Sequence, residues 1–389
     1  MAGVVVRPRS RILHGHDWVF RSEILKVFGH PQDGDVVSIK DGRDRMLGSG
    51  IYNGSSSIPV RRFSRQRLTL DEDFFRRRIA RAWAYRQERN CQPDLCRAVW
   101  SDADGLPGII IDIYGRVGVL QLLTTAMDQR KDLIVKAIQA ELPIDSLVER
   151  SDAAGRRAES LPEQKGMLLG DEPGELLCTR DQIKFHANPL LGQKTGLYLD
   201  QMENYTRVAK FAPGLHVVDC FSNQGGFALA AAHVGARSVL AIESGEEAIA
   251  SLQRNATSNQ LDIKTERTDV FDWLKKATRR NFKTDLIILD PPSFARDRRS
   301  VKDALRGYRD LHLRAATLLN KGGYLATFSC SHHITRNVFR DCLQDAFFTA
   351  KVNFRIIEEY RQASDHPSAL HLPETDYLHG LMLQINPAY

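Results

Sequence analysis

The second half of the chain alternates short apolar runs with longer helical stretches, and this pattern limits the possible folds more than any other feature. The apolar runs are residues 216–220, 238–243, 285–290 and 323–330, and the helical stretches between them include 226–236, 246–259 and 301–320. Strands that alternate with helices form βαβ units, whose right-handed crossovers connect parallel strands. From about Asn188 onward the sequence therefore predicts an α/β domain with a parallel sheet.

The first half shows other patterns. From Arg11 to about Phe63, short apolar runs alternate with Gly and Asp turns, which is typical of a small all-β unit. Residues 71–90 open with the acidic DED and predict a helix. Residues 97–185 predict a small α+β unit, in which 151–174 would form an exposed loop. Since 389 residues exceed one ordinary core, we predict three domains: 1–70, 71–187 and 188–389.

The composition excludes several classes of protein. No run approaches the roughly 18 apolar residues that a membrane span requires, so no membrane partner is expected. The N-terminal MAGVVVRPRS has too short an apolar run for a signal peptide. Six cysteines without regular spacing suggest a reducing compartment rather than a disulfide framework. A cytoplasmic location is therefore expected.

The positive charge is concentrated at the N-terminal end. Residues 1–90 contain 18 Lys and Arg against 10 Asp and Glu, whereas the whole chain has a net charge of only +6. Two arginine-rich segments, 61–67 and 76–81, account for much of this excess. A localised basic region favours a module that binds a polyanion. The alternative is a helix face that is simply solvated.

Polar side chains stand where the predicted strands of the α/β domain end. In an open α/β sheet, ligands bind beyond the carboxyl ends of the strands. Five residues are expected at that edge: Asp219, Glu243, Asp269, Asp290 and Cys330. Their coincidence on one edge predicts a binding and catalytic site.

The loop after the first of these strands indicates the cofactor. Its sequence FSNQGG lacks the G-x-G-x-x-G pattern that cradles a pyrophosphate, so a nucleoside without a diphosphate fits better, and S-adenosylmethionine is the common one. Asp219 would face the cationic methionine end, Glu243 the ribose hydroxyls and Asp269 the adenine amino group. The structural alternatives are a helix N-cap for Asp269 and tight packing for Gly225 and Gly226.

The segment Asp290-Pro291-Pro292 and the thiol of Cys330 suggest the chemistry. Two prolines after a strand stiffen the backbone, so Asp290 would be presented rigidly to a flat substrate. C5 of a pyrimidine is a poor nucleophile until a thiolate adds to C6, and Cys330 could supply that thiolate. Zinc binding by Cys330 and the following histidines is a weaker alternative, because no C-x2-C pair accompanies them; no metal is predicted. Cys220 is a rival thiol, but we expect it to be packed beneath the cofactor loop.

These motifs resemble a known family along nearly the whole chain. The matching segments are HDWVF, SDADGLPGIIID, GQKTGLYLDQ, DCFSNQGGFAL, DLIILDPPSF, RGYRDLHLRA, TFSCS and RQASDHP. They are similar to S-adenosylmethionine-dependent 23S ribosomal RNA cytosine-C5 methyltransferases with an N-terminal PUA domain. The resemblance implies a PUA RNA-binding domain, a small RNA-contacting middle domain and a class I (Rossmann-like) methyltransferase domain.

The resemblance also implies roles for individual residues. Cys330 would be the nucleophile, assisted by Asp290. The cofactor would be bound by Lys194, Thr195, Tyr198, Asp219, Phe221, Ser222, Gly225, Glu243, Asp269 and Asp290. Ribosomal RNA of the large subunit would be bound by Arg11, Trp18, Arg61, Arg62 and Arg65.

The chain departs from the family pattern at a few positions, including Asn223, Gln224 and His332. Two other functions therefore stay open: methylation of guanine N7 or of another RNA, and a non-catalytic RNA-binding role in ribosome assembly. The sequence also leaves open whether the chain forms a homodimer.

Overall fold

The computed structural model describes residues 2–192, 195–295, 299–331 and 333–386. The chain divides into two compact units. Unit 1 comprises Met1–Cys178, Ala187–Leu199 and Ser364–Thr375, and unit 2 comprises Thr179–His186, Asp200–Ala363 and Asp376–Tyr389. The three predicted domain ranges stay predictions.

Unit 1 begins with a small β-domain. Its six-stranded sheet has the order β2-β6-β5-β4-β1-β3, and its core consists of aliphatic side chains such as Val4, Val37 and Ile39, all at most 1% exposed. The strands are β1 (Gly3–Val6), β2 (Trp18–Val19), β3 (Ile24–Phe28), β4 (Val36–Lys40), β5 (Met46–Tyr52) and β6 (Val60–Ser64), with 3-10 turns at Arg11–His14 and Arg21–Glu23.

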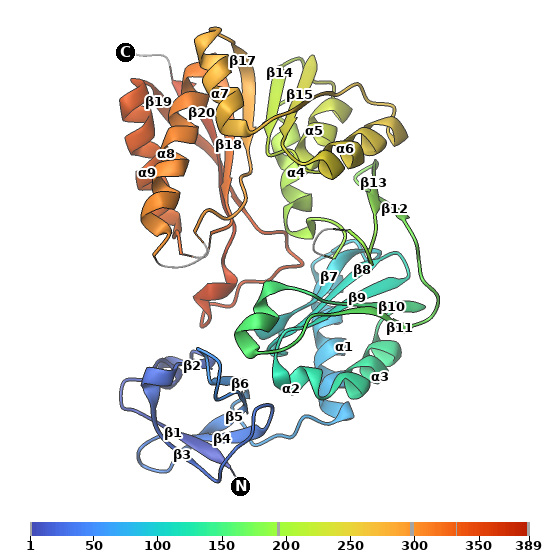
Figure 1. Ribbon diagram of the computed structural model, residues 1–389, viewed down its shortest axis with the longest axis vertical. Coiled ribbons are helices and arrows are strands. Elements are labelled where there is room, and N and C mark those ends of the chain that lie inside the picture. The colour runs from blue at the N-terminus through green and yellow to red at the C-terminus, as the bar shows by residue number, and fades with distance from the viewer. Residues whose placement is uncertain (1, 193–194, 296–298, 332, 387–389) are drawn as a thin grey trace. The chain divides into compact units, whose positions relative to one another are not determined.

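A second sheet in unit 1 is covered by helices. Asp71 caps α1 (Glu72–Glu88) by accepting a 2.8 Å hydrogen bond from the Phe74 amide, and α1 packs beside α3 (Lys131–Glu141) (Figure 1). The sheet has the order β11-β10-β9-β8-β7. Its strands are β7 (Leu95–Trp100), β8 (Ile109–Tyr114), β9 (Val117–Leu122), β10 (Ser146–Ser151) and β11 (Gln164–Leu169), with α2 at Thr125–Asp128 and 3-10 turns at Ser101–Asp104 and Ala154–Glu159.

The expectation of an exposed loop over residues 151–174 is wrong. A 3-10 turn occupies Ala154–Glu159, and β11 pairs antiparallel with β10. Because β11 is an edge strand with mostly half-buried side chains, it has no strongly apolar run by which the sequence could reveal it. A two-stranded sheet of β12 (Leu176–Arg180) and β13 (Ile183–Ala187) follows.

Unit 2 is the predicted α/β domain, built on a seven-stranded sheet of order β16-β15-β14-β17-β18-β20-β19. Helices α7, α8 and α9 cover one face of this sheet, where Trp273, Leu311 and Phe339 join its core. On the other face, Phe227 of α5 packs on Phe328 of β18, with ring centroids 5.1 Å apart. Figure 1 shows α8 and α9 lying side by side.

The elements of unit 2 follow the predicted alternation. They are α4 (Met202–Ala209), β14 (His216–Cys220), α5 (Gly226–His233), β15 (Ser238–Glu243), α6 (Glu246–Ser258), β16 (Lys264–Arg267), α7 (Val270–Arg279), β17 (Thr284–Leu289), α8 (Val301–Leu318), β18 (Leu319–Ser329), α9 (Arg336–Ala350), β19 (Asn353–Arg361) and β20 (His379–Asn386). Short 3-10 turns lie at Leu199–Gln201 and Pro373–Thr375.

Two features of this sheet differ from the expectation. The strand before Asp269 is not apolar, because β16 has the sequence KTER and lies at the sheet edge. The sheet is also not wholly parallel, since β20 runs antiparallel to both β18 and β19. An antiparallel strand in an otherwise parallel sheet is common among doubly wound folds.

Candidate active site

The parallel strands of unit 2 bring the predicted residues to one edge. Strand β14 pairs with β15 on one side and with β17 on the other, and β17 pairs in parallel with β18. The strand order reverses at β14, which is the topological switch point where α/β proteins bind ligands. Asp219, Glu243, Asp290 and Cys330 all lie at the carboxyl ends of these four strands.

The loop after β14 is tightly bent. Phe221 has a φ of 61°, and Asn223 a φ of 48°. The Ser222 amide donates to the Ile242 carbonyl at 3.2 Å, which ties the loop to β15. Gly225 has a φ of 88°, and a Cβ atom there would lie 2.7 Å from Leu252 of α6. The close packing that was the alternative for this glycine is therefore present.

Asp219 is the most deeply buried acid of the edge, at 1% exposure. Its Oδ2 accepts a 3.0 Å hydrogen bond from the Ala228 amide in α5, while Oδ1 has no hydrogen-bond partner among the described residues. Burial raises the pKa of Asp219 well above its ordinary value, the charge on Asp290 raises it further, and the hydrogen bond from Ala228 acts in the opposite direction. Glu243 also raises this pKa, so three carboxyl groups share the edge.

Glu243 organises two loops. Its Oε2 accepts from the Asn223 amide at 3.0 Å, and its Oε1 accepts from the amides of Ser244 and Gly245 at 2.7 and 2.8 Å. The Ser244 hydroxyl also donates to Oε1, at 3.3 Å. Because each carboxylate oxygen offers about two acceptor positions and Oε2 accepts only the Asn223 amide among the hydrogen bonds described, the remaining capacity for a ribose hydroxyl lies at Oε2. Asp269 is exposed and caps α7 through a 3.1 Å hydrogen bond from the Asp272 amide, which is the structural alternative that the sequence suggested for it.

Cys330 and Asp290 stand on neighbouring strand ends. The half-buried thiol of Cys330 lies directly after β18, and its Sγ lies 3.9 Å from the carbonyl oxygen of Pro291. Asp290 is half-buried directly after β17. Cys220, by contrast, is 0% exposed, and burial raises the pKa of its thiol, as expected for a packed side chain.

A hydroxyl network that the sequence did not reveal lies beneath Cys330. The Tyr308 hydroxyl of α8 donates to Ser329 Oγ at 3.1 Å, and the hydroxyls of Ser331 and Ser293 are 3.1 Å apart. Burial raises the pKa of Tyr308 to about 12, against hydrogen bonds to Ser329 and Ser331. This network connects the two residues that flank Cys330 with the loop that follows Asp290. In the sequence, Tyr308 is marked only by its place in the segment RGYRD, which resembles the known family.

The other predicted cofactor residues lie in unit 1. Thr195 is 1% exposed, and its hydroxyl donates to Asp112 at 2.6 Å and lies 3.2 Å from the Tyr114 hydroxyl. Tyr198 is half-buried. Lys194 lies outside the described residues, as does His332.

The predicted RNA-binding residues have different environments. Arg11 is half-exposed and lies 4.7 Å from the Phe20 ring centroid. The Arg61 guanidinium lies 4.7 Å from the Trp18 ring, and both side chains contact Asp102.

Arg62 differs from these residues because its side chain is only 5% exposed. It donates to Asp17 at 2.8 Å and to the carbonyls of Gly15, His16 and Leu47. Arg65 is exposed at the end of the same segment.

The residues at the edge fit S-adenosylmethionine. This cofactor carries a sulfonium and an ammonium group, whose positive charge would relieve the repulsion among the three carboxyl groups and satisfy Oδ1 of Asp219. Within the described residues, no group of three or more His, Cys, Asp and Glu side chains is arranged to hold a metal ion. No helix of the described chain is long and apolar enough to cross a membrane.

Comparisons with known proteins agree with this architecture. Residues 7–65 match the family model of a PUA-like domain, and residues 202–324 match that of conserved hypothetical protein 95. A solved structure of a protein assigned as a methyltransferase and complexed with SAH has a TM-score of 0.86 at 22% identity, over 99% of this chain and 100% of that one. A Streptococcus mutans structure, assigned as a SAM-dependent methyltransferase, has a TM-score of 0.85 at 21% identity, over the same shares. The fold is therefore that of a Rossmann-like methyltransferase domain preceded by a PUA β-domain and an α+β domain, as the sequence predicted.

The sequence relatives identify the family. Ribosomal RNA large subunit methyltransferase I of Pseudoalteromonas atlantica is 37% identical over 380 residues, which is 96% of each chain. The protein of the same name from Tolumonas auensis is 37% identical over 381 residues, again 96% of each. The chain belongs to the family of ribosomal RNA large subunit methyltransferase I.

Proposed function

We propose that this chain uses S-adenosylmethionine to methylate C5 of a cytosine in 23S ribosomal RNA, through a transient covalent bond between Cys330 and C6. The family relationship supports methylation of large-subunit ribosomal RNA with this cofactor. The observation that carries the choice of base and mechanism is the half-buried thiol of Cys330, on the strand end beside Asp290. A methyltransferase acting on guanine N7 needs no such thiol.

The cofactor would be held at the edge of the sheet by Asp219, Phe221, Ser222, Gly225, Glu243 and Asp269. Lys194, Thr195 and Tyr198 are proposed as cofactor residues on the sequence resemblance alone. When bound, it supplies an electrophilic methyl group. Asp219 would face its positive charge and Glu243 its ribose hydroxyls.

The chain's own residues would then activate the base. The Cys330 thiolate adds to C6, which breaks the C5–C6 π bond and makes C5 nucleophilic. The carboxyl group of Asp290 bonds N3 of the ring and holds it in place. After C5 has gained the methyl group, it loses its proton to a base, the C6–S bond breaks and the thiolate is regenerated. The target base would be flipped out of the RNA, as enzymes that modify bases require.

A pair of cysteine variants tests the proposal. Cys330→Ala should abolish methyl transfer and leave S-adenosylmethionine affinity within about twofold, because the thiol is not needed for cofactor binding. Cys342→Ala is the matched control, since its half-buried thiol packs against the core and donates to the Leu305 carbonyl at 3.4 Å, and it should keep full activity. Full activity of Cys330→Ala would overturn the nucleophile. Mass analysis of the digested RNA decides the base: methylated guanine would support the N7 alternative, and no methylation by the wild type would support a non-catalytic role.

A further inference from the structure

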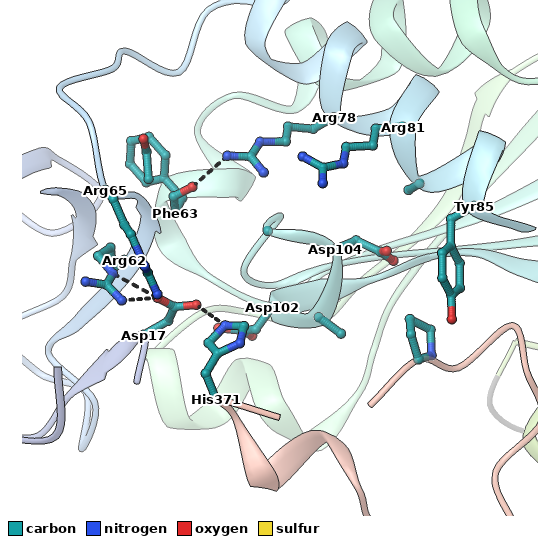
Figure 2. Close-up of a pocket in the computed structure, with 15 residues that line it drawn as sticks. Asp17, Arg62, Phe63, Arg65, Arg78, Arg81, Tyr85, Asp102, Asp104 and His371 are labelled. Carbon is teal, nitrogen blue, oxygen red and sulfur yellow. Dashed lines mark hydrogen bonds and ion pairs between the residues drawn. The ribbon is translucent and has the colours of Figure 1, made fainter. Parts of the chain in front are cut away.

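A cavity of about 520 Å³ in unit 1 is lined by basic side chains from three segments. Arg65 follows β6, Arg78 and Arg81 belong to α1, and His371 comes from the C-terminal part of the chain. Figure 2 shows Arg78 and Arg81 extending from α1 toward the side of the cavity that carries Phe63 and Arg65. The cavity is within the usual size range of ligand pockets.

The acidic side chains of this cavity are already engaged. Asp17 contacts Arg62 and His371, each at 2.8 Å. Asp102 accepts from Trp18 at 2.7 Å. Asp104 accepts from Arg86 at 2.7 Å and from the Trp100 amide at 2.6 Å. Asp102 also forms a 3.6 Å ion pair with Arg61. Each of the three carboxylates therefore has a cationic partner other than Arg65, Arg78 and Arg81.

The three arginines lack such partners. Among the described residues, no carboxylate forms an ion pair with Arg65, Arg78 or Arg81. Arg78 donates only to the Phe63 carbonyl, at 3.1 Å, and its guanidinium lies over Gly105, where a Cβ atom would be 2.8 Å away. Burial lowers the pKa of Arg78, the charge of Arg81 lowers it further, and the charge of Asp17 acts in the opposite direction. Like charges one turn apart on a helix destabilise it, so a negatively charged ligand would stabilise this arrangement.

Neighbouring arginines on the same helix show that this is not a general property of α1. Arg76 pairs with Glu141 at 2.8 Å, and Arg77 pairs with Asp73. Of the arginines of α1, only Arg78 and Arg81, which line the cavity, have no ion pair with a carboxylate in the described structure.

We propose that Arg65, Arg78 and Arg81 form a subsite for a backbone phosphate of the RNA substrate. Guanidinium groups bind phosphate oxygens through paired, charge-assisted hydrogen bonds. The volume beyond one phosphate gives room for the attached sugar and base, and Tyr85 is an aromatic residue of the cavity lining. Contacts of this kind fix the position of an RNA without reading its sequence. The inference rests on the proposed function for the identity of the RNA.

Matched arginine variants of the full chain test the subsite. Binding of a large-subunit ribosomal RNA fragment is measured by fluorescence anisotropy at several salt concentrations. Arg81→Gln and Arg78→Gln should each weaken binding roughly three- to tenfold and reduce the slope of log K against log salt by about 0.7–0.9. Arg77→Gln removes the same charge from the same helix outside the cavity and should stay within twofold of the wild type. Arg81→Gln is the cleaner variant, because the Arg81 side chain makes no hydrogen bond in the described structure, so its replacement should leave the fold unchanged.

Equal affinity and equal salt slope in Arg77→Gln, Arg78→Gln and Arg81→Gln would overturn the subsite. A second arm titrates the wild type with inorganic phosphate at constant ionic strength. Saturation at micromolar phosphate that Arg81→Gln abolishes, with RNA affinity unchanged, would make the cavity a free-anion site and would also overturn the proposal. Methylation by the wild type, measured in parallel, separates the two hypotheses: a subsite that fails in an active enzyme leaves the proposed function standing.

Discussion

Replacing Arg62 should damage the fold of the PUA domain rather than remove an exposed RNA contact. The Arg62 side chain is 5% exposed and donates to Asp17 and to three backbone carbonyls. Arg62→Gln would leave Asp17 without this partner and would leave buried carbonyls unsatisfied. Breaking a buried ion pair costs about 3–5 kcal/mol. Because Asp17 is 20% exposed and keeps its 2.8 Å contact with His371, we expect a loss at or just below the low end of this range, about 2–3 kcal/mol.

Chemical denaturation measures this loss as a lower midpoint at an unchanged slope. Arg65→Gln is the comparison, because Arg65 is exposed and its replacement should change stability by less than about 0.5 kcal/mol while it weakens RNA binding. Should Arg62→Gln unfold at the wild-type denaturant concentration and lose RNA affinity, the buried-pair reasoning fails and Arg62 is a direct contact.

Three further predictions concern unit 2. Asp219→Asn should abolish cofactor binding and raise the free energy of unfolding by about 1 kcal/mol at pH 7. Since the folded-state pKa of Asp219 is raised, the wild type loses stability as the pH rises above about 4. The difference in free energy of unfolding between the variant and the wild type should therefore grow from pH 4 to pH 7. Urea titrations at several pH values test this, and a difference that stays constant with pH would contradict it. Gly225→Ala should lower the free energy of unfolding by about 1–3 kcal/mol, because the new Cβ atom would lie 2.7 Å from Leu252 and φ is 88°. An unchanged melting temperature would contradict this. Tyr308→Phe should lower kcat about tenfold with little change in KM, because its hydroxyl positions Ser329 beside Cys330, and an unchanged kcat would remove it as a positioning residue.

The sequence predicted those parts of the fold whose periodicity depends on burial. Strands such as β14 and β17 contain the unbroken apolar stretches VV and LIIL because both faces of the sheet are covered. Edge strands lack that signal, so the charged β16 and the half-buried β11 were not recognised. The antiparallel β20 is also buried, but direction within a sheet depends on the connection and not on composition.

For the candidate site, the sequence indicated which residues end the strands but not how their side chains are used. The positions of Asp219, Asp290 and Cys330 follow from strand ends alone. Asp219 accepts a hydrogen bond from α5, and Glu243 joins two loops. Both roles depend on hydrogen bonds between separate segments of the chain, which the sequence does not show. Asn223 is a sequence signal for the tight loop, since asparagine tolerates the positive φ that the loop requires at this position.

The cavity of unit 1 shows the same limit. The run of arginines in α1 is visible in the sequence, but the ion pairs that each arginine forms decide its role. Arg77 pairs with Asp73, one turn away on the same helix. The i, i+4 spacing of these two residues predicts the pair from the sequence. The environment of Arg78 and Arg81 depends on Phe63, Gly105 and the segment around His371, which only the tertiary structure brings together.

The covalent step is tested most directly with an RNA substrate that carries 5-fluorocytosine at the target position. After methyl transfer, C5 of this base holds fluorine and a methyl group and has no proton to lose, so the C6–S bond cannot break. The account predicts a denaturant-resistant protein–RNA complex that forms only with S-adenosylmethionine and maps by mass spectrometry to Cys330. The complex should persist in Cys342→Ala and disappear in Cys330→Ala. A cross-link to Cys220, or methylation of cytosine in normal RNA without any trapped complex, would contradict the assignment of Cys330 as the nucleophile.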